Sequence, residues 1–333
     1  MRRIGLAVVL AVSLTLAPFA EAQRVPEVGV LILGTGLSLT AERGVPSMRE
    51  ALRGFGWIDG QTITLKPRFA DLKEERLTAL AQEFVDRRVD VIVAIGTPAT
   101  AAARRATTSI PIVMSGASDP IASGFARNLA RPDTNITGTS LVLTDTAAKR
   151  LQLLKEVAPR LRRTAVLYDV YSLRLLQGGP AIRNAQLDEL RAAAPRVGVE
   201  IQEFVYRDPS ALPAQFSEML AGRAEALVVV AGHRIDEARA PLAQLALRHR
   251  LPTGFTFREY VEADGLMSYG PNLGAVHQRA AYYVDRLLRG TKPADLPIEQ
   301  AATFELVINM KTAKALGLTI PQTLLLRADQ VIE

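Results

Sequence analysis

Short runs of β-branched and aliphatic residues alternate with segments of helical periodicity along this chain, and this alternation constrains the fold more than any other feature. In the first half, each run has the length of a single strand and is bounded by turn residues. Strands separated by helices run parallel and are covered by helices on both faces of their sheet. The predicted strands are 28–33, 62–69, 91–96, 111–115 and 136–141, and the predicted helices are 45–55, 74–85, 98–107 and 121–129.

The second half repeats this plan. A chain of 333 residues is longer than one hydrophobic core usually supports, which favours two units of about 100–150 residues each. The repeated pattern therefore predicts an α/β fold with two doubly wound, Rossmann-like lobes in tandem. In the second unit the predicted strands are 165–168, 200–206, 226–230 and 252–257, and the predicted helices are 181–194, 211–220 and 235–249.

The end of the chain does not fit two simple consecutive units. After Asp264 the pattern predicts a helix over 276–288, a strand over 304–308 and a short helix over 311–316. A lone helix and a lone strand cannot bury their apolar faces, so they must return to complete lobes already built. We therefore expect a multi-strand hinge between an N-terminal lobe of 27–141 plus 268–297 and a C-terminal lobe of 142–267 plus 298–333.

The first residues have the organisation of a secretory signal peptide. Arg2 and Arg3 form a positive region, residues 4–16 form an apolar run, and Ala20-Glu21-Ala22 supplies a small-x-small cleavage pattern. The apolar run is shorter than the roughly 20 residues that span a bilayer. We therefore expect residues 1–22 to be removed after Ala22 and the mature chain to reach the periplasm. It would be untethered there, because the chain has no cysteine to carry a lipoprotein anchor.

The composition argues against several classes of function. Without cysteine there is no disulfide, thiolate nucleophile or cysteine-ligated metal, and the three histidines have no partner at metal-ligand spacing, so no metal is expected. The net charge of +6 is spread along the chain, which argues against nucleic acid. A dinucleotide-binding turn begins at Gly34 but has Leu39 at its third glycine position, so no cofactor is expected. A secreted hydrolase stays open as the alternative function.

Polar residues follow three predicted strands of the first lobe. In a doubly wound sheet, strand carboxyl ends and the N-termini of the following helices face one crevice, where backbone N–H groups attract anions. We expect Thr97 to cap the helix that begins at Pro98, where it could hold a ligand carboxylate or stabilise only its own helix. Asp119 could receive a ligand amine or serve as a turn residue. The candidates here are Thr35, Thr97, Pro98, Ser115, Ser118 and Asp119.

The second lobe offers aromatic candidates at the ends of its strands. Tyr168, Tyr206 and Tyr269 stand at or just past predicted strand ends. Their rings could sandwich a planar ligand while their hydroxyls orient it, or the same rings could be lids of the core. His233 follows a predicted strand and faces the same crevice by position, where it could contact an acidic solute or form an ordinary loop hydrogen bond.

Several motifs are similar to those of one family. They are the segments 54–60, 89–94, 110–113, 119–120, 135–138, 265–272, 292–300 and 309–318. Together they resemble the ABC transporter substrate-binding family that includes tryptophan-binding-type proteins, over nearly the whole mature chain. The stretch 168–186 departs from that pattern, because it is longer and richer in tyrosine and arginine, so ligand contacts are not carried over from it.

The resemblance implies a type I periplasmic-binding-protein fold and a ligand held between lobes that close about their hinge. It also implies a small carboxylate as the solute, either an amino acid or an aromatic acid, and the membrane permease of an ABC importer as the partner. Tyr269 lies within one of the matching motifs, which favours it as a ligand contact. We expect the protein to act as a monomer.

Overall fold

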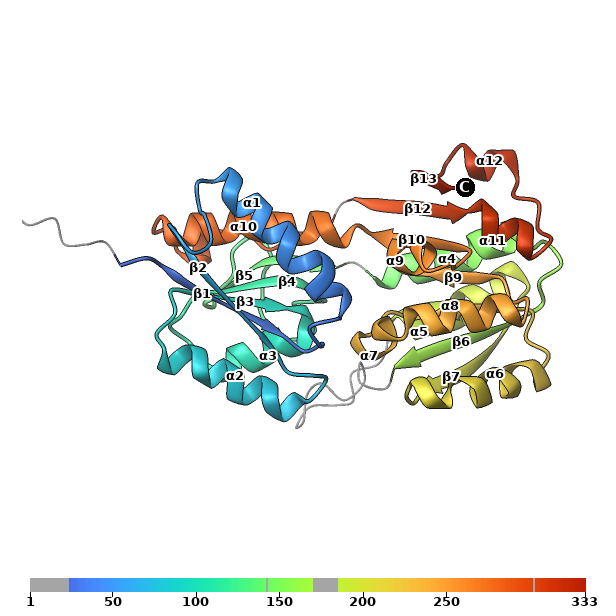
Figure 1. Cartoon of the computed structure of the whole chain (residues 1–333), viewed down its shortest axis with the longest axis horizontal. Helices are drawn as coiled ribbons and strands as arrows, with labels where there is room; N and C mark the ends of the chain where they lie inside the picture. The colour runs from blue at the N-terminus through green and yellow to red at the C-terminus, as the bar shows by residue number, and fades with distance from the viewer. Residues whose placement is uncertain (1–23, 142, 170–184, 302) are drawn as a thin grey trace, which may run out of the picture.

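The computed structural model describes residues 24–141, 143–169, 185–301 and 303–333, which form two α/β lobes side by side (Figure 1). We call the lobe built on the first sheet the N-lobe and the lobe built on the second sheet the C-lobe. Helices cover both faces of each sheet, which confirms the predicted fold class. The predicted signal peptide and the start of the predicted helix 181–194 lie outside the described residues. In the part of the chain that the structure describes, no helix has the length and apolar character needed to cross a membrane.

The N-lobe sheet contains six strands in the order β11-β5-β4-β3-β1-β2, all of them parallel. Strands β1 and β3 are aliphatic and almost wholly buried, as expected for strands covered on both faces. The strands are β1 (Glu27–Ile32), β2 (Thr64–Phe69), β3 (Val91–Ile95), β4 (Ile112–Ser118), β5 (Ile136–Leu141) and β11 (Glu299–Gln300).

Two helices pack on each face of this sheet. Helices α1 (Val45–Gly54) and α10 (Leu273–Leu288) cover one face, and α2 (Glu74–Asp86) and α3 (Gly96–Ala106) cover the other. A single apolar stripe of each helix faces the sheet because its apolar residues recur every three or four positions. Since α10 comes from far along the chain, the N-lobe is built from separate stretches of sequence.

The C-lobe sheet contains seven strands in the order β13-β12-β10-β9-β8-β6-β7. Strand β12 runs antiparallel to β10, because the chain enters it from the N-lobe rather than through a crossover helix. The other neighbours are parallel. The strands are β6 (Arg163–Asp169), β7 (Glu200–Tyr206), β8 (Ala226–Val229), β9 (Thr253–Phe255), β10 (Met267–Pro271), β12 (Phe304–Asn309) and β13 (Gln330–Ile332).

The C-lobe helices also divide between two faces. Helices α4 (Thr144–Val157) and α5 (Ala185–Ala193) cover one face, and α6 (Leu212–Ala221) and α8 (Arg239–Arg248) cover the other. Two short helices, α7 (His233–Glu237) and α9 (Arg258–Glu262), lie on the side of the N-lobe. Helices α11 (Met310–Ala315) and α12 (Gln322–Leu325) pack near the end of the chain.

The structure differs from the predicted helices in three ways. Residues 121–129 form turns instead of a helix, and Gly124, with a φ of 68°, adopts a conformation that an α-helix does not use. Helices α4, α9 and α12 were not predicted. The predicted helix 235–249 is two helices, because Pro241 in the first turn of α8 has no N–H to donate back to α7.

Within the described residues, the chain crosses between the two sheets after Leu141, after Pro271 and after Gln300. The strand pairing differs at two points from the predicted division of the chain into lobes. All of β10 pairs within the C-lobe sheet, although the prediction places 268–271 in the N-lobe. Strand β11 pairs with β5 in the N-lobe sheet, although the prediction places 298–300 in the C-lobe. The crossings therefore follow the carboxyl ends of β5, β10 and β11.

Candidate ligand-binding site

The carboxyl ends of the two sheets face each other, and the arrowhead of β6 points toward the N-lobe in Figure 1. The backbone N–H of Thr35, in the loop after β1, donates a hydrogen bond to the Glu237 carboxylate of α7 at 2.8 Å. Gly96, at the start of α3, lies so close to His233 that a Cβ added to it would be 2.7 Å from the histidine Nε2. The structure therefore brings Thr35 and His233, both predicted site residues, to one interface between the lobes, which is the candidate site.

Thr97 does not cap its helix as predicted. Helix α3 begins two residues earlier than predicted, at Gly96, whose φ of 79° turns the chain from β3 into the helix. No side chain caps this helix start, and the Thr97 hydroxyl accepts the backbone N–H of Ser118 at 2.9 Å. Thr97 thus joins the loops that follow β3 and β4, and the N-terminus of α3 faces His233 of the C-lobe. Pro98 is buried in the first turn of the same helix.

Ser115 is engaged by a residue that the sequence did not single out. Its hydroxyl lies 2.7 Å from Nδ1 of His277 on α10, and both side chains are buried. Loss of contact with water lowers the pKa of His277 to about 4, so the imidazole is neutral at ordinary pH. Ser115 therefore fixes β4 against the hinge-proximal helix α10.

Asp119 serves its own turn. Its carboxylate accepts the backbone N–H of Ala122 at 2.9 Å, and its side chain is exposed. Its φ of 36° shows that the chain reverses sharply at this point. This geometry matches the turn interpretation of Asp119, which the sequence left open beside an amine-binding one.

The three strand-end tyrosines do not form a single aromatic sandwich. Tyr206 is 1% exposed and belongs to the cluster that packs under α6 and α8. Tyr168 and Tyr269 lie on the opposite face of the sheet, against the cluster under α4 and α5, and Tyr269 stacks on Phe304 with centroids 6.2 Å apart. Burial raises the pKa of Tyr206 to about 12. The lid interpretation therefore fits Tyr206.

The C-lobe wall of the site carries an acidic group that the sequence analysis missed. Asp236, on α7, accepts a hydrogen bond from the Tyr260 hydroxyl at 2.7 Å. Burial, together with repulsion from the nearby Asp169 carboxylate, raises the pKa of Asp236 to about 7. Tyr260 is itself held by stacking on Phe255, with centroids 4.5 Å apart. Two carboxyl groups thus share the wall of the C-lobe.

His233 completes this wall. It begins α7, and burial lowers the pKa of its imidazole to about 4, so it faces α3 as a neutral group. Asp169 ends β6 and is fully buried. Asp169 directly follows the predicted strand 165–168, and this position could have identified it as a candidate site residue from the sequence. Nothing in the sequence marks the burial of Asp236.

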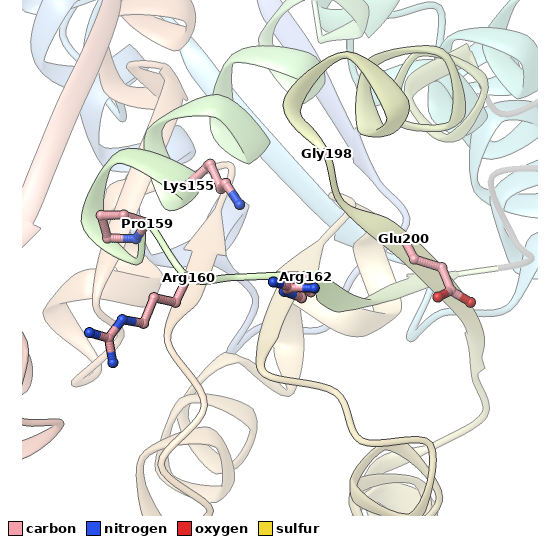
Figure 2. A pocket seen from close by; sticks show the side chains of 6 residues that line it. All are labelled: Lys155, Pro159, Arg160, Arg162, Gly198 and Glu200. Atoms are coloured by element: carbon pink, nitrogen blue, oxygen red, sulfur yellow. The ribbon is translucent and has the colours of Figure 1, made fainter.

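A hollow on the C-lobe surface lies away from this site (Figure 2). It is formed by the end of α4 and the amino ends of β6 and β7, whereas the candidate site is at the carboxyl ends of those strands. Half of its lining residues are basic, and the lining comprises Lys155, Pro159, Arg160, Arg162, Gly198 and Glu200. It contributes nothing to the interface between the lobes.

Two facing α/β lobes joined by three crossings define the class of type I periplasmic binding proteins, as predicted. This chain belongs to the ABC transporter substrate binding protein family, whose model matches residues 27–332. It is 27% identical over 290 residues to the tyrosine-binding protein of Clostridioides difficile (strain R20291), a match that covers 85% of this chain and 80% of that protein. The family assignment supports a solute-binding protein of an ABC importer over the secreted hydrolase.

Solved structures show the same fold. A conserved domain protein from Vibrio cholerae matches with a TM-score of 0.82 at 23% identity, covering 92% of this chain and 100% of that chain. A Streptococcus pneumoniae ABC domain in complex with L-Trp has a TM-score of 0.81 at 23% identity, with coverage of 92% and 99%. The ligand-free, open structure of a substrate binding protein from Clostridium difficile has a TM-score of 0.66 at 25% identity, with coverage of 92% and 99%.

Proposed function

We propose that this protein captures an aromatic L-amino acid between its lobes and presents it to the membrane permease of an ABC importer. The observation that carries this proposal is the opposite chemistry of the two walls. The N-lobe wall offers the uncapped N-terminus of α3, which favours an anion, and the C-lobe wall offers the carboxyl groups of Asp169 and Asp236. A zwitterion placed between them would direct its carboxylate to one wall and its ammonium to the other.

Asp236 is suited to an ammonium group. In the ligand-free site its ionised form is disfavoured by burial and by Asp169, so a cation placed nearby would relieve the repulsion between the two carboxylates. An aromatic acid without an amine would add a third negative group to the pair. This argument favours an amino acid over an aromatic acid that lacks the amine.

Two related proteins support an aromatic side chain. The relative from Clostridioides difficile is named a tyrosine-binding protein, and the Streptococcus pneumoniae neighbour is a complex with L-Trp. We assign contact roles to the candidates at the facing strand ends, which are Thr35, Thr97, Pro98, Ser118 and His233, together with Asp169 and Asp236. Ser115 and Tyr206 would act indirectly through packing. The ligand roles of Tyr168, Tyr269 and Asp119 stay predictions from the sequence.

Capture would proceed by rotation of the lobes about the three crossings. The lobes move as two bodies of discontinuous sequence, and the ligand is released unaltered to the permease. Export would follow cleavage of residues 1–22, and the mature protein would act as a periplasmic monomer. The signal-peptide pattern and the family support the export of the protein.

The experiment compares ligands that lack one charged group at a time. Thermal shift and calorimetry on the mature chain would use L-tryptophan, L-tyrosine and L-phenylalanine, with tryptamine and indole-3-propionate as analogues. We expect at least one L-amino acid to raise the melting temperature, because a ligand that binds only the folded state stabilises it. Neither analogue should do so at equal concentration. Equal binding of tryptamine, or chemical conversion of the bound amino acid, would contradict the proposal.

A further inference from the structure

We propose that four charged residues outside the ligand site form a charge latch that holds the lobes closed and thereby sets the affinity for the solute. The charge latch consists of Glu42 and Arg43 on the N-lobe and of Arg239 and Glu262 on the C-lobe. It acts without touching the ligand, by raising the fraction of ligand-free protein in the closed, binding-competent arrangement. The part of this inference that concerns affinity rests on the proposed function, whereas the part that concerns closure does not.

Each of the two ion pairs joins an acidic residue of one lobe to a basic residue of the other lobe. Glu42 accepts from Arg239 on α8 at 2.6 Å, and Arg43 donates to Glu262 on α9 at 2.6 Å. Glu42 and Arg43 lie in a π-helical turn, Thr40–Gly44, that leads into α1. Neighbouring residues of opposite charge thus meet two different C-lobe helices, which fixes the register of the two lobes against each other.

An apolar contact lies beside the charge latch. Leu39, which precedes the π-helical turn, is only 4% exposed and belongs to a buried cluster of C-lobe residues that includes Ile235 and Tyr260. Opening the lobes would expose this side chain to water, which is unfavourable. The hydrogen bond from the Thr35 N–H to Glu237 lies on the same side. Together these contacts form a continuous interface that exists only in the closed arrangement.

One side chain of the charge latch and the turn that carries two others are held within their own lobes. In the C-lobe, Glu262 also accepts from Arg258 at 3.1 Å, and Arg258 in turn pairs with Glu305. In the N-lobe, Gly44 at the end of the π-helical turn packs on His277, with room for no side chain. Because Glu262 is already ordered, closing loses less entropy of this side chain than an ordinary surface pair would.

The comparisons agree with a closed arrangement of the lobes. The overall fit is better to the complex with L-Trp, with a TM-score of 0.81, than to the ligand-free, open structure, with a TM-score of 0.66. The apparent affinity of a binding protein falls in proportion to the fraction that is competent to bind. A change in the charge latch would therefore alter the closed fraction and the affinity by the same factor.

The experiment exchanges the charges of one pair. Glu42→Arg and Arg239→Glu would each be measured alone and then together. Closure is read without ligand from the distance between spin labels at Thr78→Cys on α2 and Glu218→Cys on α6, two exposed positions on a chain without native cysteine. We expect each single variant to lower the closed-to-open ratio roughly fivefold, the upper range for an exposed ion pair. The exchanged pair should return to within about twofold of the parent.

Arg43→Ala gives an independent test, because Arg43 is 53% exposed and its removal cannot disturb a core. It should lower the closed-to-open ratio as well, and salt should do the same, since exposed ion pairs are screened. The matched control is Glu156→Arg, which breaks an exposed ion pair with Arg327 inside the C-lobe and should leave closure unchanged.

An unchanged distance distribution in the single variants, or failure of the exchanged pair to recover, would overturn the charge latch. The affinity for L-tryptophan is then measured on the same variants, and the weakening should match the loss of closure. If closure responds while L-tryptophan and the other aromatic amino acids fail to bind, the charge latch stands and the proposed solute is wrong. The two proposals can therefore fail separately.

Discussion

The two walls of the candidate site are built in different ways. The N-lobe wall is mostly backbone, formed by the start of α3 and the loops after β1 and β4, with the neutral hydroxyl of Thr97 linking two of them. The C-lobe wall is made of ionisable side chains that are wholly or partly buried, above all Asp236, whose pKa lies near 7. The N-lobe wall should therefore act alike at every physiological pH, whereas the C-lobe wall should depend on protonation.

The two walls should also contribute differently to binding: the N-lobe wall to affinity and the C-lobe wall to selectivity. Helix N-termini attract any anion, so the N-lobe wall would accept carboxylates in general. A buried carboxyl group discriminates sharply, because a ligand without a cation leaves it unpaired or protonated. We therefore expect the choice between amino acids and other small acids to be made by the C-lobe.

The largest effect should follow from Asp236→Asn. The amide keeps an acceptor for the Tyr260 hydroxyl but removes the charge that would pair with the ligand ammonium. We expect affinity for the aromatic L-amino acid to fall about 100-fold, in line with the cost of removing one partner of a buried charge pair. Calorimetry measures the affinity, and the melting temperature verifies folding. Asp133→Asn, which breaks an exposed pair with Arg127, is the matched control and should bind normally. Affinity within threefold of the parent would rule out Asp236 as the amine partner.

The next effect concerns pH. The folded-state pKa of Asp236, about 7, lies above its unfolded value near 3.8, so the folded state binds the extra proton between these values. Its contribution to the stability of the ligand-free protein is present below about pH 4 and is lost as pH rises through 7. The affinity for the ligand should depend on pH in the opposite direction, because the ligand ammonium pairs only with the ionised carboxylate of Asp236. Affinity should be about tenfold tighter at pH 8 than at pH 6.

Asp236→Asn should remove this pH dependence of affinity, while Thr97→Ser should retain it. The neutral His233, whose pKa is about 4, does not titrate in this range. Calorimetry at several pH values measures both dependences. A flat affinity profile in the parent protein would show that no carboxyl group with a raised pKa contacts the ligand.

The sequence predicted the N-lobe wall better than the C-lobe wall, and the reason is physical. The positions of Thr35, Thr97 and Ser118 follow from strand periodicity, because polar residues after buried strands reach the same sheet edge. Even there the cap at Thr97 was wrong, since Gly96 turns the chain with a positive φ and begins the helix two residues early. Local patterns give positions but not hydrogen-bond partners.

The missed residues depend on packing between distant segments. The pKa of Asp236 is set by burial and by Asp169, and Tyr260 reaches it from a different helix. The pairing of Ser115 with His277 joins residues 162 positions apart. Helix α4 was missed although it buries Leu151 and Leu154 in the C-lobe core. No window of neighbouring residues contains the first two facts, whereas the helical spacing of Leu151, Leu154 and Val157 in α4 is a local signal.

A smaller effect should follow from Thr97→Val. Valine has nearly the same shape but cannot accept the Ser118 N–H, so the loops after β3 and β4 would lose one tie. We expect the free energy of unfolding to fall by about 1 kcal/mol and the affinity to weaken about fivefold. Urea unfolding and calorimetry measure these. Thr97→Ser keeps the hydroxyl and should match the parent, and a Thr97→Val protein that binds as well as the parent would show that this tie does not shape the N-lobe wall.

The smallest effect should follow from Tyr206→Phe, which separates the lid interpretation from the sandwich interpretation. Tyr206 is 1% exposed among core residues such as Leu212 and Phe216, and its raised pKa keeps it neutral. Removing the hydroxyl leaves the ring in place, so affinity should stay within about twofold of the parent. Tyr206→Ala would instead leave a cavity and lower the free energy of unfolding by about 3–5 kcal/mol. If Tyr206→Phe weakened binding more than tenfold at an unchanged melting temperature, the Tyr206 hydroxyl would be a ligand contact. The C-lobe wall would then include the end of β7.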